Sequence, residues 1–216
     1  MGGDDESGSS PEQQFALLGG ALCLDFANTA DWHAGDAPVE LLTGYDALLA
    51  WGRDTGILDD RQAHWLADEA ERSPDAAAAT LRRAVILREA IYRLFAALAA
   101  ADEPDAADLA TINAELADAL PHRQLARGDG NRFDWAWQGG GLDCLLWPVA
   151  LSAAELLISD DLGRVRQCAG HPCGWLFIDA SRNRSRRWCS MESCGNRAKA
   201  RRHYQRARSG SATNDR

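Results

Sequence analysis

The sequence predicts an α+β fold in two parts: a mainly helical N-terminal domain with a few short strands, and a small cysteine-rich C-terminal module. Two observations carry this prediction. Apolar residues recur at helical spacing over most of the first 160 or so positions, and four of the six cysteines lie between Cys168 and Cys194. At 216 residues, the chain has room for one domain of ordinary size and a small module.

Residues 15–160 are expected to form the N-terminal domain. Its clearest helix is 75–101, where Pro74 precedes a segment with apolar residues mostly three or four positions apart. Similar periodicity predicts further helices at 41–51, at 59–70, after Pro104, and at 142–158, the last with a kink or a late start at Pro148. Alternating apolar residues predict short strands at 22–26 and 133–137. The ends, 1–14 and 209–216, are expected to be disordered tails.

Composition excludes several classes of protein. The chain is 46% hydrophobic and 25% charged, as in ordinary globular proteins. It has no apolar run near the roughly 20 residues that a membrane span needs, and its acidic, glycine-rich start differs from a secretory signal. A cytoplasmic protein without membrane contact is therefore expected.

Charge is distributed unevenly along the chain. Between Arg164 and Arg208 there are twelve Lys or Arg residues against two acidic ones, a local balance of +10. Because the whole chain carries −9, the remainder carries −19. This asymmetry predicts an acidic domain joined to a cationic module, for which polyanions are natural partners.

The cysteines divide in the same way. Cys23 and Cys144 stand alone in apolar surroundings and are interpreted as small buried hydrophobes. The other four form two pairs with four intervening residues each, a spacing that suits tetrahedral zinc. Four thiolates close the coordination shell, so we expect one structural zinc ion; an iron–sulfur cluster, unligated thiols or substitution by His171 are the alternatives. The predicted ligands are Cys168, Cys173, Cys189 and Cys194.

The segments around the pairs predict a treble-clef-like four-cysteine zinc finger over 164–208. An apolar strand at 175–179 is followed by a polar, basic loop at 181–187. After the second pair, 195–208 is expected to be a helix whose Ala200, Tyr204 and Ala207 face the metal core.

Two motifs connect the chain to a known family. Cys194-Gly195-Asn196-Arg197 closes the second pair, and FIDASRNRSRRW (177–188) precedes it. This module resembles the CGNR zinc finger, over about 165–206. GALCLDFANT (20–29) is similar to the opening motif of the ABATE domain, the N-terminal partner in that family, and Trp51 and the segments around 133–148 add to the similarity. The resemblance implies an ABATE-like domain, a zinc finger and a stress-induced transcription regulator.

The basic residues of the finger predict contact with DNA. Arginine offers a planar fork suited to phosphates and to guanine. Alternatively, some arginines balance the formal −2 charge of a zinc ion with four thiolates, or dock on the acidic domain. The predicted nucleic-acid-binding residues are Arg182, Arg184, Arg186, Arg187, Arg197, Lys199, Arg201 and Arg202.

We expect no enzyme, because the sequence carries none of the common catalytic or phosphate-binding motifs. Polar residues after the first predicted strand could line a ligand pocket, although such groups more often cap a helix or close a turn; they are Asp25, Asn28, Thr29 and Trp32. The expected function is a transcription regulator that binds DNA through the finger and senses a ligand or partner through the N-terminal domain. A regulatory protein whose finger docks on a protein or RNA is the alternative, and an enzyme at residues 25–33 is the third hypothesis.

Overall fold

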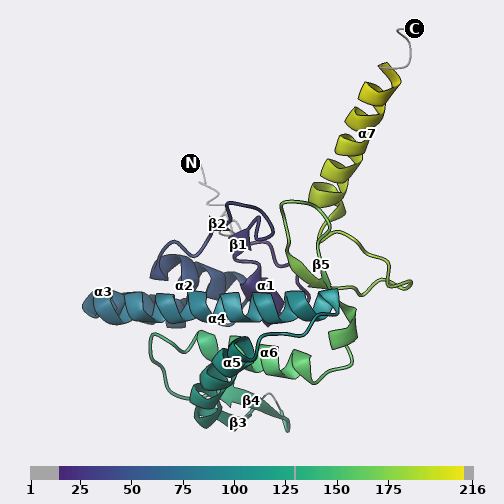
Figure 1. The fold of residues 1–216 in the computed structure, drawn as a ribbon. Helices are drawn as coiled ribbons and strands as arrows, with labels where there is room; N and C mark the ends of the chain where they lie inside the picture. The colour runs from purple at the N-terminus through teal and green to yellow at the C-terminus, as the bar shows by residue number, and fades with distance from the viewer. Residues whose placement is uncertain (1–14, 129, 212–216) are drawn as a thin grey trace, which may run out of the picture.

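The computed structural model describes residues 15–128 and 130–211, and it is an α+β structure of helices and small two-stranded sheets (Figure 1). The predicted tail at 1–14 lies outside the described residues, as does the 212–216 part of the predicted tail at 209–216. Positions 209–211 belong to the last helix.

The N-terminal domain contains the predicted helices, with shifted ends. They are α2 (Tyr45–Asp54), α3 (Asp60–Arg72), α4 (Pro74–Ala100), α5 (Ala106–Ala119) and α6 (Leu146–Leu157). Another helix, α1 (Leu22–Ala27), lies where a strand was predicted. Antiparallel pairs join β1 (Ala30–Asp31) to β2 (Val39–Glu40) and β3 (Arg123–Arg127) to β4 (Phe133–Trp137), and 3-10 turns follow α5 and α6 at η1 (Leu120–His122) and η2 (Leu162–Arg164). The predicted strand at 133–137 is therefore present as β4, whereas β3 has no apolar alternation and was not predicted.

Local sequence signals explain where the long helices begin. At α3, the Asp59 carboxylate accepts from the backbone N–H of Gln62 (2.7 Å) and the Gln62 side chain accepts from the N–H of Asp59 (3.0 Å), which is a capping box. Pro74 opens α4, where its missing N–H costs nothing. Pro148 lies in the first turn of α6 for the same reason, so this helix starts late, at Leu146.

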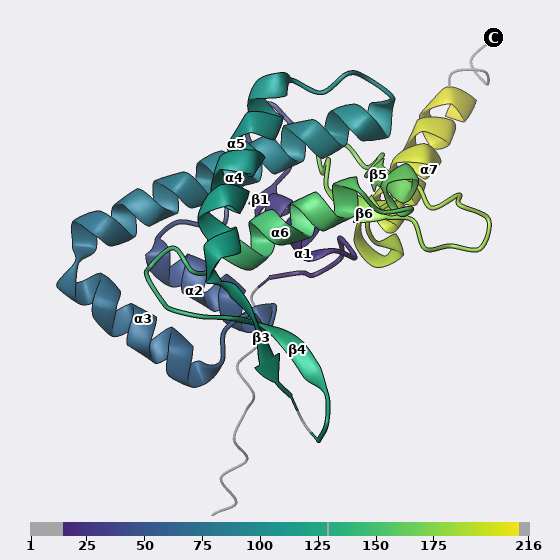
Figure 2. The same ribbon diagram turned by 90° about the horizontal axis from the view of Figure 1, so that it is seen from below.

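Helix α4 passes through the middle of the domain, and the other helices pack around it (Figure 2). The largest fully buried side chains include Phe26 of α1, Trp51 of α2 and Phe95 of α4. The Phe26 and Trp51 rings are tilted, with centroids 4.9 Å apart. Burial of each such side chain stabilises the fold by about 1.5–3 kcal/mol.

The strand predicted at 22–26 is wrong, because this segment is helix α1. Its buried residues are Cys23, Leu24, Phe26 and Ala27, a spacing that follows one side of a helix. The alternation of Leu22, Leu24 and Phe26 that suggested a strand arose because the segment is apolar on nearly every side. Periodicity distinguishes helix from strand only where one face is polar.

The C-terminal module is a small finger attached to this domain. Strand β5 (Val165–Gln167) pairs antiparallel with β6 (Leu176–Ile178), and the π-helical turn η3 (Met191–Gly195) leads into α7 (Asn196–Ser211). A hairpin followed by a cysteine-bearing helix start agrees with the predicted four-cysteine finger. Val165 and Leu176 belong to the core of the N-terminal domain rather than to a separate finger core.

Helix α7 projects from the finger, away from the N-terminal domain (Figures 1 and 2). Ala200 is exposed and the Tyr204 side chain is 71% exposed, so the prediction that this face covers the metal core is wrong. The cysteine cluster lies at the start of α7, so the later turns of the helix do not pack against it. The Ala207 side chain lies outside the described part of the chain. No helix within the described residues is long and apolar enough to cross a membrane.

Candidate metal centre and basic surface

The four predicted ligands meet in one buried cluster. The sulfur atoms of Cys168, Cys173, Cys189 and Cys194 all lie within 4.8 Å of one another. The Cys173 and Cys189 sulfurs are 3.6 Å apart, and those of Cys189 and Cys194 are 3.7 Å apart. Disulfide sulfurs would be about 2.05 Å apart, whereas four sulfurs placed about 2.3 Å from a tetrahedral zinc ion would be about 3.8 Å apart. The donor set and its geometry fit zinc.

The chain supplies donors to these sulfurs. The backbone N–H groups of Gly170 and Cys189 donate to Cys168 Sγ, both at 3.4 Å, and the Arg197 guanidinium donates to Cys194 Sγ at 2.9 Å. Hydrogen bonds from the Cys173 and Cys189 thiols lower the pKa of Cys168, and the same proximity to Cys168 raises the pKa of Cys189. Four sulfurs this close cannot all ionise without a cation among them.

Local structure holds the ligands in place. Gly170 lies against Cys194, and a Cβ atom at position 170 would be 2.9 Å from the Cys194 Cβ, so a larger residue would displace the second pair. The Ser190 hydroxyl accepts from the N–H groups of Glu192 and Ser193 and so starts the turn that carries Cys194.

Two of the predicted DNA-binding arginines are engaged within the finger. Arg197 contacts Cys194, as above, and its charge also opposes the rise that burial causes in the pKa of Asp31. Arg186 donates from Nε to the Trp188 carbonyl (3.0 Å) and from its guanidinium to the Cys189 carbonyl, and the guanidinium lies 4.4 Å from the centre of the Phe177 ring. These contacts brace the loop and balance the cluster, which was the alternative role for some of the arginines.

The other six predicted cations are exposed and form no salt bridge with another described residue. Three lie on the loop between β6 and the second cysteine pair, and three lie on α7. They are Arg182, Arg184, Arg187, Lys199, Arg201 and Arg202. The loop and the helix extend from the finger in different directions (Figure 1). The exposed side chains of these six cations are hereafter called the basic surface.

Three of the four residues considered for a pocket, Asp25, Asn28 and Thr29, have hydrogen-bond partners for their side chains within the protein. Asp25 accepts from the N–H of Gly19 (2.7 Å), and burial raises its pKa to about 6. Thr29 donates to the Phe26 carbonyl (2.8 Å) and closes the end of α1. Trp32 is 44% exposed, with a left-handed backbone (φ 56°). The contacts of Asp25 and Thr29 fit the alternative role for this group, which is to close a turn. A ligand pocket at these residues stays a prediction.

Asn28 joins the N-terminal domain to the finger. Its amide donates to the Leu176 carbonyl (2.9 Å) and accepts from the Leu176 N–H (2.8 Å), and the residue is only 3% exposed. The Asn28 side chain thereby forms with Leu176 the pair of hydrogen bonds that a neighbouring strand would form with β6. The predicted acidic–basic division of the chain gave no sign of this contact.

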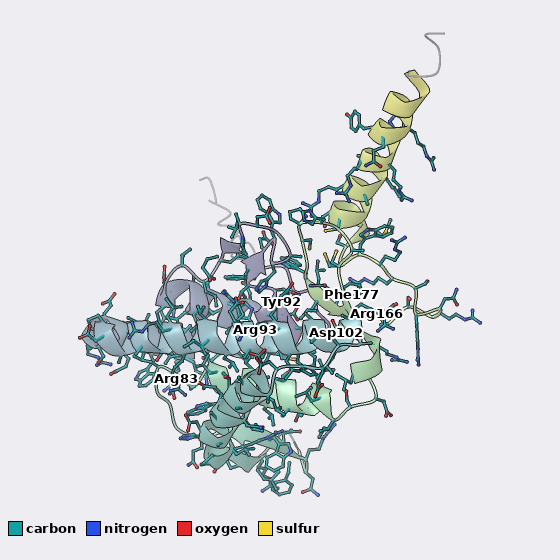
Figure 3. The ribbon with its side chains drawn as sticks, in the orientation of Figure 1. Arg83, Tyr92, Arg93, Asp102, Arg166 and Phe177 are labelled. Atoms are coloured by element: carbon teal, nitrogen blue, oxygen red, sulfur yellow. The ribbon has the colours of Figure 1, made fainter. Side chains whose placement is uncertain are left out.

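Further contacts extend the junction. The Trp175 indole donates to the Ala30 carbonyl (3.1 Å), and the N–H of Ile178 donates to the Gly19 carbonyl (2.8 Å). Tyr92 donates to the Gly174 carbonyl (3.2 Å) and accepts from the Gln167 amide (2.8 Å). Figure 3 shows Tyr92 on the half of α4 that leads toward the finger, whose β6 carries Phe177. No motif in the sequence marks Tyr92 or Gln167, and only the fold brings them together.

Comparison with known families agrees with this architecture. Residues 20–160 match the ABATE family, described as "Putative stress-induced transcription regulator", and residues 164–207 match the CGNR zinc finger. A search of curated proteins found no match. With the finger family and the clustered cysteines taken together, the chain holds one structural zinc ion. The ABATE match covers well over half of the 216 residues, and the chain therefore belongs to the ABATE family, with a C-terminal CGNR zinc finger.

Proposed function

We propose that this protein is a cytoplasmic transcription regulator, not an enzyme, that binds DNA through the basic surface and senses a ligand or partner through its N-terminal domain. The observation that carries the proposal is the basic surface itself. Six exposed cations without salt-bridge partners among the described residues extend from a finger whose attached domain is strongly acidic. Exposed cations without such partners are available to phosphates.

The two halves of the basic surface suit different contacts. Arg182, Arg184 and Arg187 lie on a loop, where side chains adapt to a phosphate backbone but are poorly fixed for reading bases. Helix α7 starts at the cysteine cluster and stands clear of the domain, and an α-helix fits the major groove. Arg201 and Arg202 on this helix are therefore the candidates for base contacts.

The first experiment selects preferred duplexes from a random DNA library with the zinc-loaded full chain. Affinity is then measured on preferred and random duplexes over a series of salt concentrations. The double variant Arg182→Gln/Arg184→Gln should weaken binding to all sequences alike and flatten the salt slope by about two. Arg201→Ala should cost about 1–3 kcal/mol on the preferred duplex and less on random DNA.

Arg82→Gln is the matched control, because Arg82 is an exposed cation on α4, away from the finger. Equal losses from Arg82→Gln and Arg201→Ala would contradict groove reading by α7. No loss from either finger variant would contradict DNA binding and favour docking on a protein or RNA.

A further inference from the structure

Residues of α2, α3 and α4 line an open cleft of about 450 Å³ in the N-terminal domain. The N-terminal part of α4 lies beside α2 and α3, at the end of the domain away from the finger (Figure 2). The volume falls within the range of small-molecule sites, roughly 300–1,000 Å³. The lining residues that determine its chemistry are Tyr45, Asp46, Leu49, Ala70, Glu71 and Leu81.

The wall of the cleft is mainly carbon. Four alanines and two leucines contribute to it, and the small alanine side chains leave the space between the helices open. The Tyr45 hydroxyl already donates to the Leu142 carbonyl (2.7 Å), so this residue mainly offers its ring. Such a wall favours an apolar ligand body.

The charged residues that line the cleft are Asp46 and Glu71, both acidic and exposed. Neither forms a salt bridge with another described residue. A smaller hollow shares Asp46 and also contains Arg53, but Arg53 is paired with Asp60 at 2.8 Å. The charged side chains in the lining of the cleft are therefore negative, and no salt bridge among the described residues balances them.

We propose that this cleft binds amphipathic organic cations: the apolar body packs against the alanine-rich wall, and the positive charge lies near Asp46 and Glu71. The acidic domain around the cleft raises the local concentration of cations. This inference gives a location and a ligand class to the sensing part of the proposed function, and rests on that proposal only for its regulatory meaning.

The test uses two probes of the same shape and opposite charge, tetraphenylphosphonium and tetraphenylborate. Equilibrium dialysis measures their binding to the zinc-loaded full chain without DNA, so a failure of DNA binding would leave this test intact. We expect the phosphonium to bind and the borate to bind at least tenfold more weakly. Equal affinity for the two probes would overturn the proposal.

Variants separate the cleft from the overall charge of the domain. Asp46→Asn and Glu71→Gln should each weaken phosphonium binding about threefold, and together about tenfold, as expected for exposed charges. Asp68→Asn removes an exposed carboxylate from α3 outside the cleft and should leave affinity within a factor of 1.5 or so of the wild type. Ala70→Leu, which fills the cleft without changing charge, should also weaken binding. Thermal melts identify any variant that fails to fold, and equal effects from Asp46→Asn and Asp68→Asn would show general attraction to an acidic protein and refute the site.

Discussion

The junction at Asn28 makes a quantitative prediction about stability. Asn28→Ala removes both hydrogen bonds to Leu176, at 2.9 and 2.8 Å, and leaves a buried N–H and a buried carbonyl without partners. Each unsatisfied buried group costs about 1–3 kcal/mol, so for the two groups we expect a loss of about 2–6 kcal/mol. This is a large part of the 5–15 kcal/mol that stabilises a typical domain.

Urea denaturation followed by tryptophan fluorescence measures the loss, since Trp51 lies in the helical core and Trp175 in the finger. Asn113→Ala on the exposed side of α5 is the matched control and should change stability by only a few tenths of a kcal/mol. A loss below about 0.5 kcal/mol in Asn28→Ala would refute the structural role of this amide.

The same variant in a Cys189→Ser background tests the cause. Metal binding supplies the folding energy of small zinc modules, so Cys189→Ser should release the finger from the domain. Leu176 would then no longer be hydrogen-bonded to Asn28. The loss of unfolding free energy caused by Asn28→Ala should therefore fall to near zero in this background. An unchanged cost of about 2–6 kcal/mol would mean that β6 stays docked without metal.

Three further predictions concern metal, pH and truncation. Elemental analysis should find one zinc per chain, and Cys189→Ser should lose it; full zinc in that variant would contradict the ligand set. Burial raises the pKa of Asp25 to about 6 from 3.8, so the folded state holds a proton that the unfolded state releases, and stability falls as pH rises from about 4 to 6. Asp25→Asn should remove this fall, which is at most about 3 kcal/mol; parallel urea-stability curves against pH would contradict it. The fragment 1–160 should not bind DNA, and because it lacks Val165 and Leu176 it should be about 3–6 kcal/mol less stable than the full chain; equal stability in urea would show that the finger adds nothing to this core.

The sequence predicted those parts of the fold in which one face of a segment is polar. The long α4 has buried residues such as Leu87, Ile91 and Phe95 on one side and exposed arginines on the other, and its bounds were predicted to within a residue. Helix α1 was mistaken for a strand because apolar residues surround it almost completely. Strand β3 was missed because its residues are mostly polar and its identity depends on pairing with β4.

The metal centre could be predicted because its chemistry is local: four cysteines in two short pairs can reach one ion whatever the rest of the fold does. The roles of individual arginines could not. Arg186 and Arg187 are neighbours of the same type in the same basic run, yet Arg186 donates to the Trp188 carbonyl while Arg187 is exposed. Counting charges in the sequence predicts that the finger has a basic surface. Only the path of the backbone determines which arginines form contacts within the finger and which stay exposed.

The role of Asn28 also could not be predicted from the sequence. A polar residue after an apolar segment can line a pocket, cap a helix or receive another part of the chain, and each role needs the same donor and acceptor groups. Here the partner, Leu176, lies 148 positions away, so no local pattern distinguishes the three roles. The opening motif of the N-terminal domain therefore contacts β6, one strand of the hairpin that carries the first cysteine pair. Hydrogen bonds of Asn28, at the end of α1, and of Tyr92, on α4, connect the N-terminal domain to β6 and Gly174.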